Sequence, residues 1–116
     1  MSVNGIEVTD VIVFPTNRNG RFLETQWQHI ERFYKVHKKG SSLKAYVRII
    51  LNDNLVINGL RVIQGKKGPF VSFPQREYDD GKMYDVCFPI TTELRMYIVD
   101  QVLSQYSISL HVEEGA

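Results

Sequence analysis

The clearest hydrophobic pattern in the chain is a strict alternation between residues 43 and 51. Lys44, Tyr46 and Arg48 share one face of this stretch. The other face is apolar, formed by Leu43, Ala45, Val47, Ile49 and Leu51. A period of two residues is that of a β-strand buried on one side. The pattern therefore predicts a strand whose outward row carries a cation, an aromatic ring and a second cation.

We expect this strand to return as a hairpin. Asn52-Asp53-Asn54 follow it, and these residue types tolerate the left-handed backbone of a tight turn. Residues 55–63 then form the second strand. Asn58-Gly59 interrupts it, which predicts a β-bulge or a close approach of another backbone segment. Arg61 alternates with apolar neighbours, so we expect its side chain to be exposed.

Shorter strands flank this hairpin. Gly65-Lys66-Lys67-Gly68 forms a turn that leads into one of them, with glycine supplying a positive φ. Pro74 ends that strand because proline cannot donate to a strand ladder, and residues 75–81 form a polar loop. The patterns predict these short strands over residues 6–14, 70–73 and 82–88.

Residues 21–38 are compatible with two structures. Leu23, Trp27, Ile30 and Tyr34 recur at helical spacing, which favours a helix. The aromatic and β-branched residues near the end of the segment favour a long hairpin arm instead. Residues 32–39 mix cations with aromatic rings, a combination that can hold phosphates and stack bases. A solvated basic face with a buried aromatic edge has the same composition.

The C-terminal part predicts one helix over residues 93–105. Thr91 or Thr92 can cap its start, and Glu93 in the first turn suits the helix dipole. An apolar arc lies along one side of this helix, formed by Leu94, Ile98, Val99, Val102, Leu103 and Tyr106. Residues 107–112 alternate again and predict a short last strand.

These elements predict an α+β fold in a single domain spanning residues 1–116. An antiparallel sheet of about five strands has one C-terminal helix packed on it, and an insertion, a helix or a long hairpin arm, lies between the first two strands. No helix separates the strands after residue 43, which argues against parallel pairing. Since one helix covers only part of one sheet face, we expect a homodimer that buries the rest.

Charge divides the chain more sharply than its net value of +1 indicates. Residues 18–76 hold twelve lysines and arginines and three acidic residues, whereas residues 77–116 hold two and eight. If the two parts form different faces, the basic face suits DNA or RNA, but interleaving in the fold would cancel the field.

Neither a signal peptide nor a membrane span is visible. The N-terminus lacks a basic start followed by an apolar block, and no apolar run approaches the roughly 20 residues of a span. A single cysteine, Cys87, suits a reducing compartment. We therefore expect a cytoplasmic protein without a membrane partner.

Signals of catalysis are weak. Cys87 lies in a predicted apolar strand with no histidine beside it, which favours a packed structural thiol. The three histidines are scattered without metal-ligand spacing, and Asp79-Asp80-Gly81 is typical of a turn. Glycine loops of the nucleotide-binding type are absent. The sequence therefore predicts no enzyme, no cofactor, no metal site and no small-molecule substrate.

The stretch from Leu60 to Ile90 carries a family resemblance. Its glycines, prolines and strand residues stand as Leu60-Arg61-Val62-Ile63, Gly65, Gly68, Phe70-Val71-Ser72-Phe73-Pro74, Gly81, Asp85 and Pro89-Ile90. In this order and spacing the stretch resembles the core of the SpoVG family, small bacterial nucleic-acid-binding regulators linked to sporulation and septation. The resemblance runs from about Leu43 to Tyr106 and implies a dimer. The family's basic cluster after a Met-Pro-Ser element falls on Arg76, while its second basic position falls on the acidic Glu77.

Together these patterns predict a nucleic-acid-binding regulator that holds backbone phosphates through basic loops. The expected contact residues are Arg61, Lys66, Lys67 and Arg76, extended by Lys38 and Lys39 of the insertion. The alternative is a protein-interaction module without direct nucleic-acid binding. The acidic C-terminal part, Glu77 and the near-neutral total charge favour that alternative.

Overall fold

The computed structural model describes residues 2–16 and 42–115 of the chain. Within them the elements follow in the order β1 (Val8–Pro15), β2 (Leu43–Leu51), β3 (Leu55–Gly65), β4 (Gly68–Ser72), β5 (Gln75–Glu77), β6 (Met83–Asp85) and α2 (Thr92–Gly115). The expected insertion lies outside the described residues, so its structure stays a prediction, as does the placement of Lys38 and Lys39.

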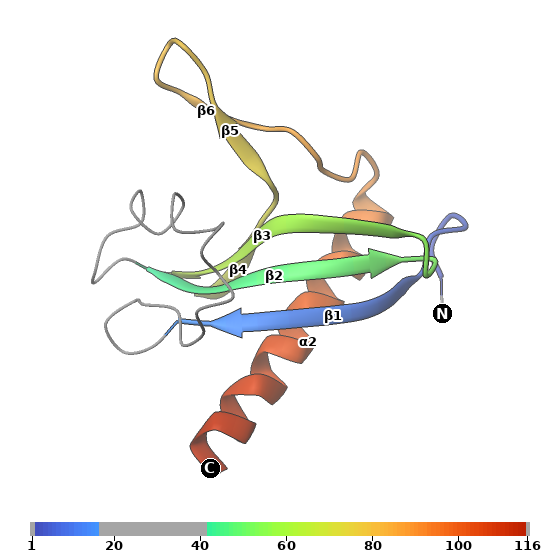
Figure 1. The fold of residues 1–116 in the computed structure, drawn as a ribbon, viewed down its shortest axis with the longest axis vertical. Helices are drawn as coiled ribbons and strands as arrows, with labels where there is room; N and C mark the ends of the chain where they lie inside the picture. Colours follow the sequence, from blue (N-terminus) through green and yellow to red (C-terminus); the bar gives the residue numbers. More distant parts are fainter. Residues whose placement is uncertain (1, 17–41, 116) are drawn as a thin grey trace.

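The strands form two antiparallel sheets (Figure 1). The larger sheet has the order β1-β2-β3-β4, and β5 pairs only with β6. The α+β class, the antiparallel pairing and the C-terminal helix on the sheet are thereby confirmed. The expected sheet of about five strands is instead four strands and a separate pair. The chain leaves the larger sheet at Pro74, which has no amide proton to continue the ladder.

The hairpin between β2 and β3 forms as its residues predict. Asn52 and Asp53 both adopt a φ of 52°, the left-handed conformation that these residue types tolerate. Further along β3, Gly59 has a φ of +91° where the register with β2 shifts. A Cβ atom on Gly59 would lie 3.5 Å from the Cβ atom of Pro74. The predicted bulge therefore occurs at this glycine, whereas Pro74 lies only at ordinary contact distance and no unusually close approach of another described backbone segment is seen there.

The N-terminal strand joins the sheet through a second irregularity. The register of β1 against β2 shifts between Val8 and Asp10, so that Val11 and Val13 pack on the core while Asp10 is exposed. The amide of Val8 donates a hydrogen bond of 2.8 Å to the hydroxyl oxygen of Tyr97. This bond ties the start of β1 to helix α2.

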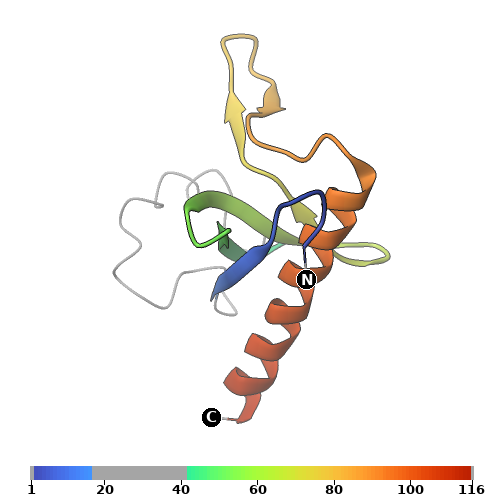
Figure 2. The same cartoon turned by 90° about the vertical axis from the view of Figure 1, so that its right-hand side faces the viewer.

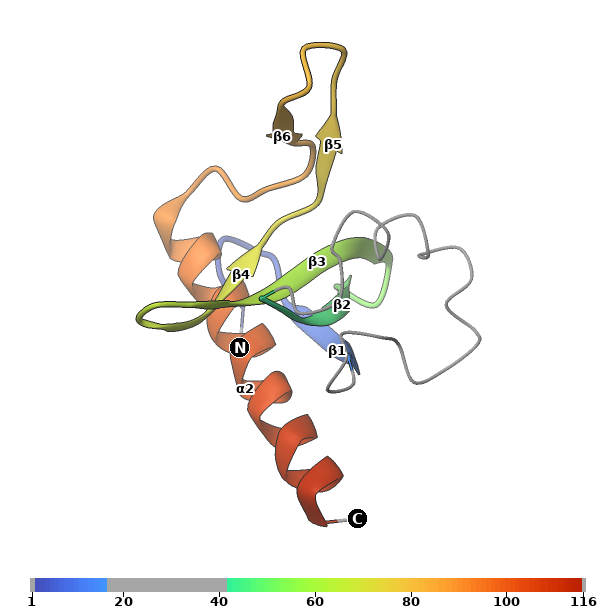
Figure 3. The same ribbon diagram turned by 90° about the vertical axis from the view of Figure 1, so that its left-hand side faces the viewer.

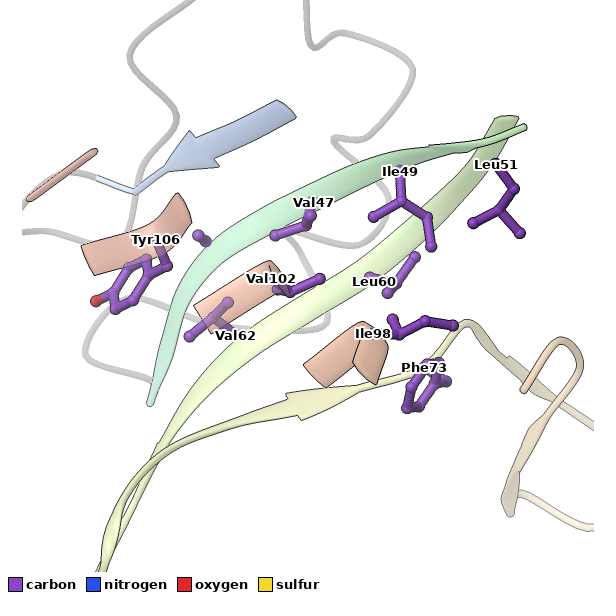
Figure 4. Close-up of a cluster of buried hydrophobic side chains, with 10 residues drawn as sticks. Val47, Ile49, Leu51, Leu60, Val62, Phe73, Ile98, Val102 and Tyr106 are labelled. Carbon is purple, nitrogen blue, oxygen red and sulfur yellow. The ribbon is translucent and has the colours of Figure 1, made fainter. Parts of the chain in front are cut away.

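The core lies between helix α2 and one face of β2 and β3 (Figure 4). The alternating apolar residues of β2 are buried as predicted, together with Leu60 and Val62 of β3. From the helix, Ile98, Val102 and Tyr106 meet this face at a spacing of four residues, one turn apart. Because hydrophobic stabilisation scales with the apolar area removed from water, we expect this contact to be the main source of stability among the described residues.

Helix α2 begins as expected but ends much later. The amide of Leu94 donates to the hydroxyl oxygen of Thr91 over 3.3 Å, which satisfies one free donor of the first turn. The helix then continues through the region where a last strand was expected, residues 107–112, and that expectation was wrong. Residues 92–114 contain no proline or glycine that would interrupt the helix. Tyr106, one turn after Val102, is still buried, so packing on the sheet continues one residue past the predicted end of the helix.

We expect Ile98→Ala to lower the free energy of unfolding by about 2–5 kcal/mol, because it removes a buried side chain and leaves a cavity. Met96→Ala on the exposed side of the same helix is the matched control, since Met96 is 66% exposed, and it should change stability by about 0.5 kcal/mol or less. Chemical denaturation followed by circular dichroism measures both. Equal effects of the two substitutions would contradict the packing of α2.

Candidate nucleic-acid interface

Lys66 and Lys67 form the tip of the hairpin between β3 and β4. They span the two positions between Gly65 and Gly68, which pair with each other in the ladder. Both lysines are exposed. Gly68 has a φ of +124°, which a side chain at this position would disfavour. Figures 2 and 3 show that this hairpin extends past helix α2, so its tip is open to a large ligand.

Arg76 lies on β5, in a hairpin of residues 75–85 that we call the arm. Its side chain is exposed, and its guanidinium carbon is 5.7 Å from the centre of the Tyr78 ring, within range of a cation–π contact. Tyr78 in turn meets Tyr84 edge to face, with ring centres 5.2 Å apart. These contacts restrict the side chain of Arg76 without covering it.

The turn of the arm is closed by Asp80. Its carboxylate accepts hydrogen bonds from the amide of Lys82 at 2.9 Å and from the hydroxyl of Tyr84 at 2.8 Å. These bonds lower the pKa of Asp80, and the bond from its hydroxyl raises the pKa of Tyr84. The expected turn at Asp79-Asp80-Gly81 is confirmed. No cluster of metal-ligating residues occurs in the part of the chain that the structure describes.

The two cationic hairpins point in different directions. In Figure 3 the hairpin of β3 and β4 extends to the left of the helix, while β5 and β6 rise above the sheet. The turned view in Figure 2 shows the same divergence. Lys66 and Lys67 therefore do not share one local cluster with Arg76 in a single chain.

Arg61 occupies a buried position, which corrects the expectation that it is exposed. Only 7% of its surface is accessible, and Nη2 donates to Ser72 Oγ at 2.7 Å and to Gln75 Oε1 at 2.8 Å. Burial lowers its pKa, an effect that Tyr46 and Asp85 partly offset. Alternation does place it on the face away from the helix, but β4 and the start of β5 supply partners that enclose it. Arg61 is thus withdrawn from the candidate phosphate contacts.

The side chains on the outward face of β2 are only partly exposed to solvent. Tyr46, opposite Arg61 in the ladder, is 2% exposed, and burial raises its pKa. Lys44 is exposed, while Arg48 is half-buried and donates from Nε to Asn58 Oδ1 at 2.7 Å. A cation–aromatic–cation strip open to solvent is therefore absent from β2.

Sequence reasoning overlooked Phe70 as a surface residue. It lies on β4 close to the two tip lysines and is 49% exposed. An aromatic residue two positions after a glycine- and lysine-containing turn was the available signal, but the sequence patterns placed it only in a short strand.

The chain is similar to known proteins over most of its length. The SpoVG family model matches residues 29–108. The chain belongs to the SpoVG family. It is 43% identical over 75 residues to a protein of Archaeoglobus fulgidus named "Putative septation protein SpoVG", covering 65% of this chain and 87% of that protein. A protein of the same name from an Anaeromyxobacter species is 31% identical over 105 residues, covering 90% of this chain and 86% of the relative.

The SpoVG resemblance stated from the sequence is thus confirmed, and the stretch that carries it can be placed on the fold. Residues 60–90 include the part of β3 that leads to Lys66 and Lys67, all of β4, and the arm. They end in the linker between β6 and α2, residues 86–91. The relatives are named as septation proteins rather than as enzymes. No helix of the described residues is long and apolar enough to cross a membrane.

Cys87 does not lie in a buried strand, contrary to the expectation from the sequence. It is exposed and lies in the linker after β6, because β5 offers only three residues for pairing and the ladder ends at Asp85. With Phe88 and Pro89 it borders a partly open apolar cavity of about 170 Å³ against the core. A packed structural thiol was therefore the wrong expectation.

We expect Arg61→Ala to lower the free energy of unfolding by about 2 kcal/mol, because it leaves the partly buried oxygens of Ser72 and Gln75 without their charged donor. Arg76→Ala removes an exposed arginine of the same size and should cost about 0.5 kcal/mol or less. Urea denaturation compares the two proteins. If Arg61→Ala is as stable as Arg76→Ala, the buried role of Arg61 is refuted.

Proposed function

We propose that this SpoVG-family chain is a nucleic-acid-binding regulatory protein that holds DNA or RNA by its backbone phosphates, acting in gene regulation linked to septation and sporulation. The observation that carries the proposal is the exposed Lys66-Lys67 turn on a hairpin that extends beyond the body of the domain. Lysine and arginine bind phosphates largely independently of base sequence. The turn therefore positions the ligand and supplies affinity rather than sequence selectivity.

Arg76 is the second proposed phosphate contact. It is exposed, and its contact with Tyr78 restricts its orientation before any ligand binds. A restricted side chain loses less freedom on binding, which favours affinity. Glu77 follows it on β5 and is also exposed, so β5 presents one cation and one anion rather than two cations. The arm's contribution to phosphate binding is accordingly smaller than that of the Lys66-Lys67 turn.

We also propose that the protein acts as a homodimer joined along the arm and the linker to α2. This region exposes a series of large apolar side chains: Tyr78, Met83, Tyr84, Val86, Phe88 and Ile90. An isolated two-stranded hairpin is marginally stable in water, and contiguous exposed apolar surface is typical of an interaction site. Pairing with a second copy would cover this surface and bring two sets of cationic hairpins onto one ligand.

A protein-interaction module without nucleic-acid binding is the second candidate. The same apolar residues of the arm and linker favour it, since they would suit another protein as well as a second copy. Salt separates the two functions. Phosphate contacts weaken steeply as salt rises because bound counterions are released, whereas an apolar interface does not behave in this way.

We expect Lys66→Ala/Lys67→Ala to weaken binding to every DNA or RNA tested and to flatten the slope of log K against log salt by about 0.9 per cation on duplex DNA. Adding Arg76→Ala should flatten it further. Lys44→Ala/Arg95→Ala is the matched control, because it also removes two exposed cations, neither of which lies on the turn or the arm. Fluorescence anisotropy over a salt series measures the slopes. Equal slopes for the two double variants would refute the assignment of this turn.

We expect sedimentation equilibrium at micromolar concentration to give the mass of a dimer, and Ile90→Glu to shift it toward the monomer. Ile90 is 90% exposed in the single chain, so a charge there should not disturb the fold of one copy but should be costly inside an apolar interface. Met96→Glu, on the exposed side of α2, should leave the mass unchanged. A monomer mass for the parent protein throughout this range would exclude the dimer.

A further inference from the structure

The exposed ring of Phe70 lies on the hairpin of β3 and β4, and it has no role in the proposed phosphate binding. Phe70 pairs with Ile63 across the ladder, two positions from the closing pair Gly65 and Gly68. Its side chain is 49% exposed. A large apolar side chain so close to a projecting tip has little core to pack against, so burial of the ring does not account for its presence.

The orientation of the Phe70 ring is fixed from one side by Gly65. A Cβ atom on Gly65 would lie 3.1 Å from Cδ1 and 3.2 Å from Cε1 of the ring, closer than most side chains come. The ring therefore lies against the bare backbone of this glycine. Ile63, directly across the ladder, supports it on the same face of the sheet. The rest of the ring remains accessible in a defined position.

The charged residues near Phe70 along the chain are of one sign. Lys66 and Lys67 are exposed at the adjoining turn, and no acidic residue occurs between Asn54 and Arg76. Single-stranded nucleic acids bind to this combination, in which an aromatic ring stacks on a base and neighbouring cations hold the phosphates. An apolar protein partner would make use of the ring but not of the two lysines.

We propose that Phe70 stacks on an unpaired base while Lys66 and Lys67 hold the flanking phosphates, so that the hairpin tip is a binding site for single-stranded nucleic acid. The proposal rests on the nucleic-acid binding proposed above and adds the class of ligand. In a paired duplex the faces of the bases are covered by their neighbours, so the ring has no surface to stack on. The stacking contact then discriminates single strands from duplexes.

The test compares Phe70→Leu, Phe70→Tyr and the parent on a mixed-sequence 20-nucleotide DNA strand and on its duplex. Phe70→Leu should weaken single-strand binding by about 5- to 150-fold, leave the salt slope unchanged and alter duplex binding by less than about twofold. Phe70→Tyr retains a ring that can stack and should bind like the parent. Met96→Leu is the matched control, since Met96 is 66% exposed on α2, outside the proposed dimer surface, and it should not change single-strand affinity.

Three results would overturn the proposal, and they separate it from the phosphate contacts. If Phe70→Leu binds single strands like the parent while Lys66→Ala/Lys67→Ala does not, phosphate binding stands and stacking is wrong. If Phe70→Leu lowers the melting temperature and weakens single-strand and duplex binding equally, the ring is structural. If the parent binds neither ligand at any salt concentration, both the stacking and the proposed function fail.

Discussion

The contact between helix α2 and one face of β2 and β3 is the interaction on which the other features depend. It buries Ile98, Val102 and Tyr106 against the alternating apolar residues of the central hairpin. Because α2 is the only helix in the described residues, this face of the sheet is where the domain places its core. The β3–β4 hairpin tip and the arm extend beyond this core. The exposed side chains of this tip and of the arm lie outside the core and are accessible to a ligand.

The direction of the arm is set where it leaves the larger sheet. Pro74 packs beside Gly59 of β3, and the carbonyl of Pro74 accepts a hydrogen bond of 2.8 Å from the amide of Val86. Beside this bond, Gln75 accepts from Arg61 and donates to Asp85 Oδ1 at 2.8 Å. The two strands of the arm are therefore joined at their base to the buried guanidinium. Arg61, expected to contact phosphate, instead holds the base of the arm.

The sequence was most informative where a pattern depends on local chemistry. The period of two over residues 43–51, the turn at Asn52 and Asp53 and the bulge at Gly59 all follow from side-chain shape and backbone freedom, and all occur in the structure. Expectations failed where burial depends on distant segments. Alternation gives the side of the sheet on which Arg61 lies, but not that Ser72 and Gln75 enclose it. Residues 107–112 alternate, yet neighbouring helical turns already packed on the sheet decided their structure.

The candidate site was predictable in the same uneven way. The charge and glycines of residues 65–68 were enough to place an exposed cationic turn, because two paired glycines around two lysines favour a tight hairpin. The divergence of this turn from Arg76 could not be foreseen, since it results from the departure of the chain from the sheet at Pro74 and the bonds that fix the arm. Phe70 required the register: only its pairing with Ile63, near Gly65, shows that its ring is held at the tip.

Burying an arginine to hold the arm is costly in free energy. This cost indicates what Arg61 contributes to the structure. Removing a guanidinium from water costs several kcal/mol, which hydrogen bonds return only in part, and apolar side chains of similar volume often stabilise a protein equally well or better. Leucine in place of Arg61 could fill the space beneath Tyr46 but could not bond to Ser72 and Gln75. Directional bonds specify an orientation that apolar packing leaves loose. The buried Arg61 thus makes the interior less favourable in free energy. Its hydrogen bonds, however, fix one direction in which the arm that carries Arg76 leaves the sheet.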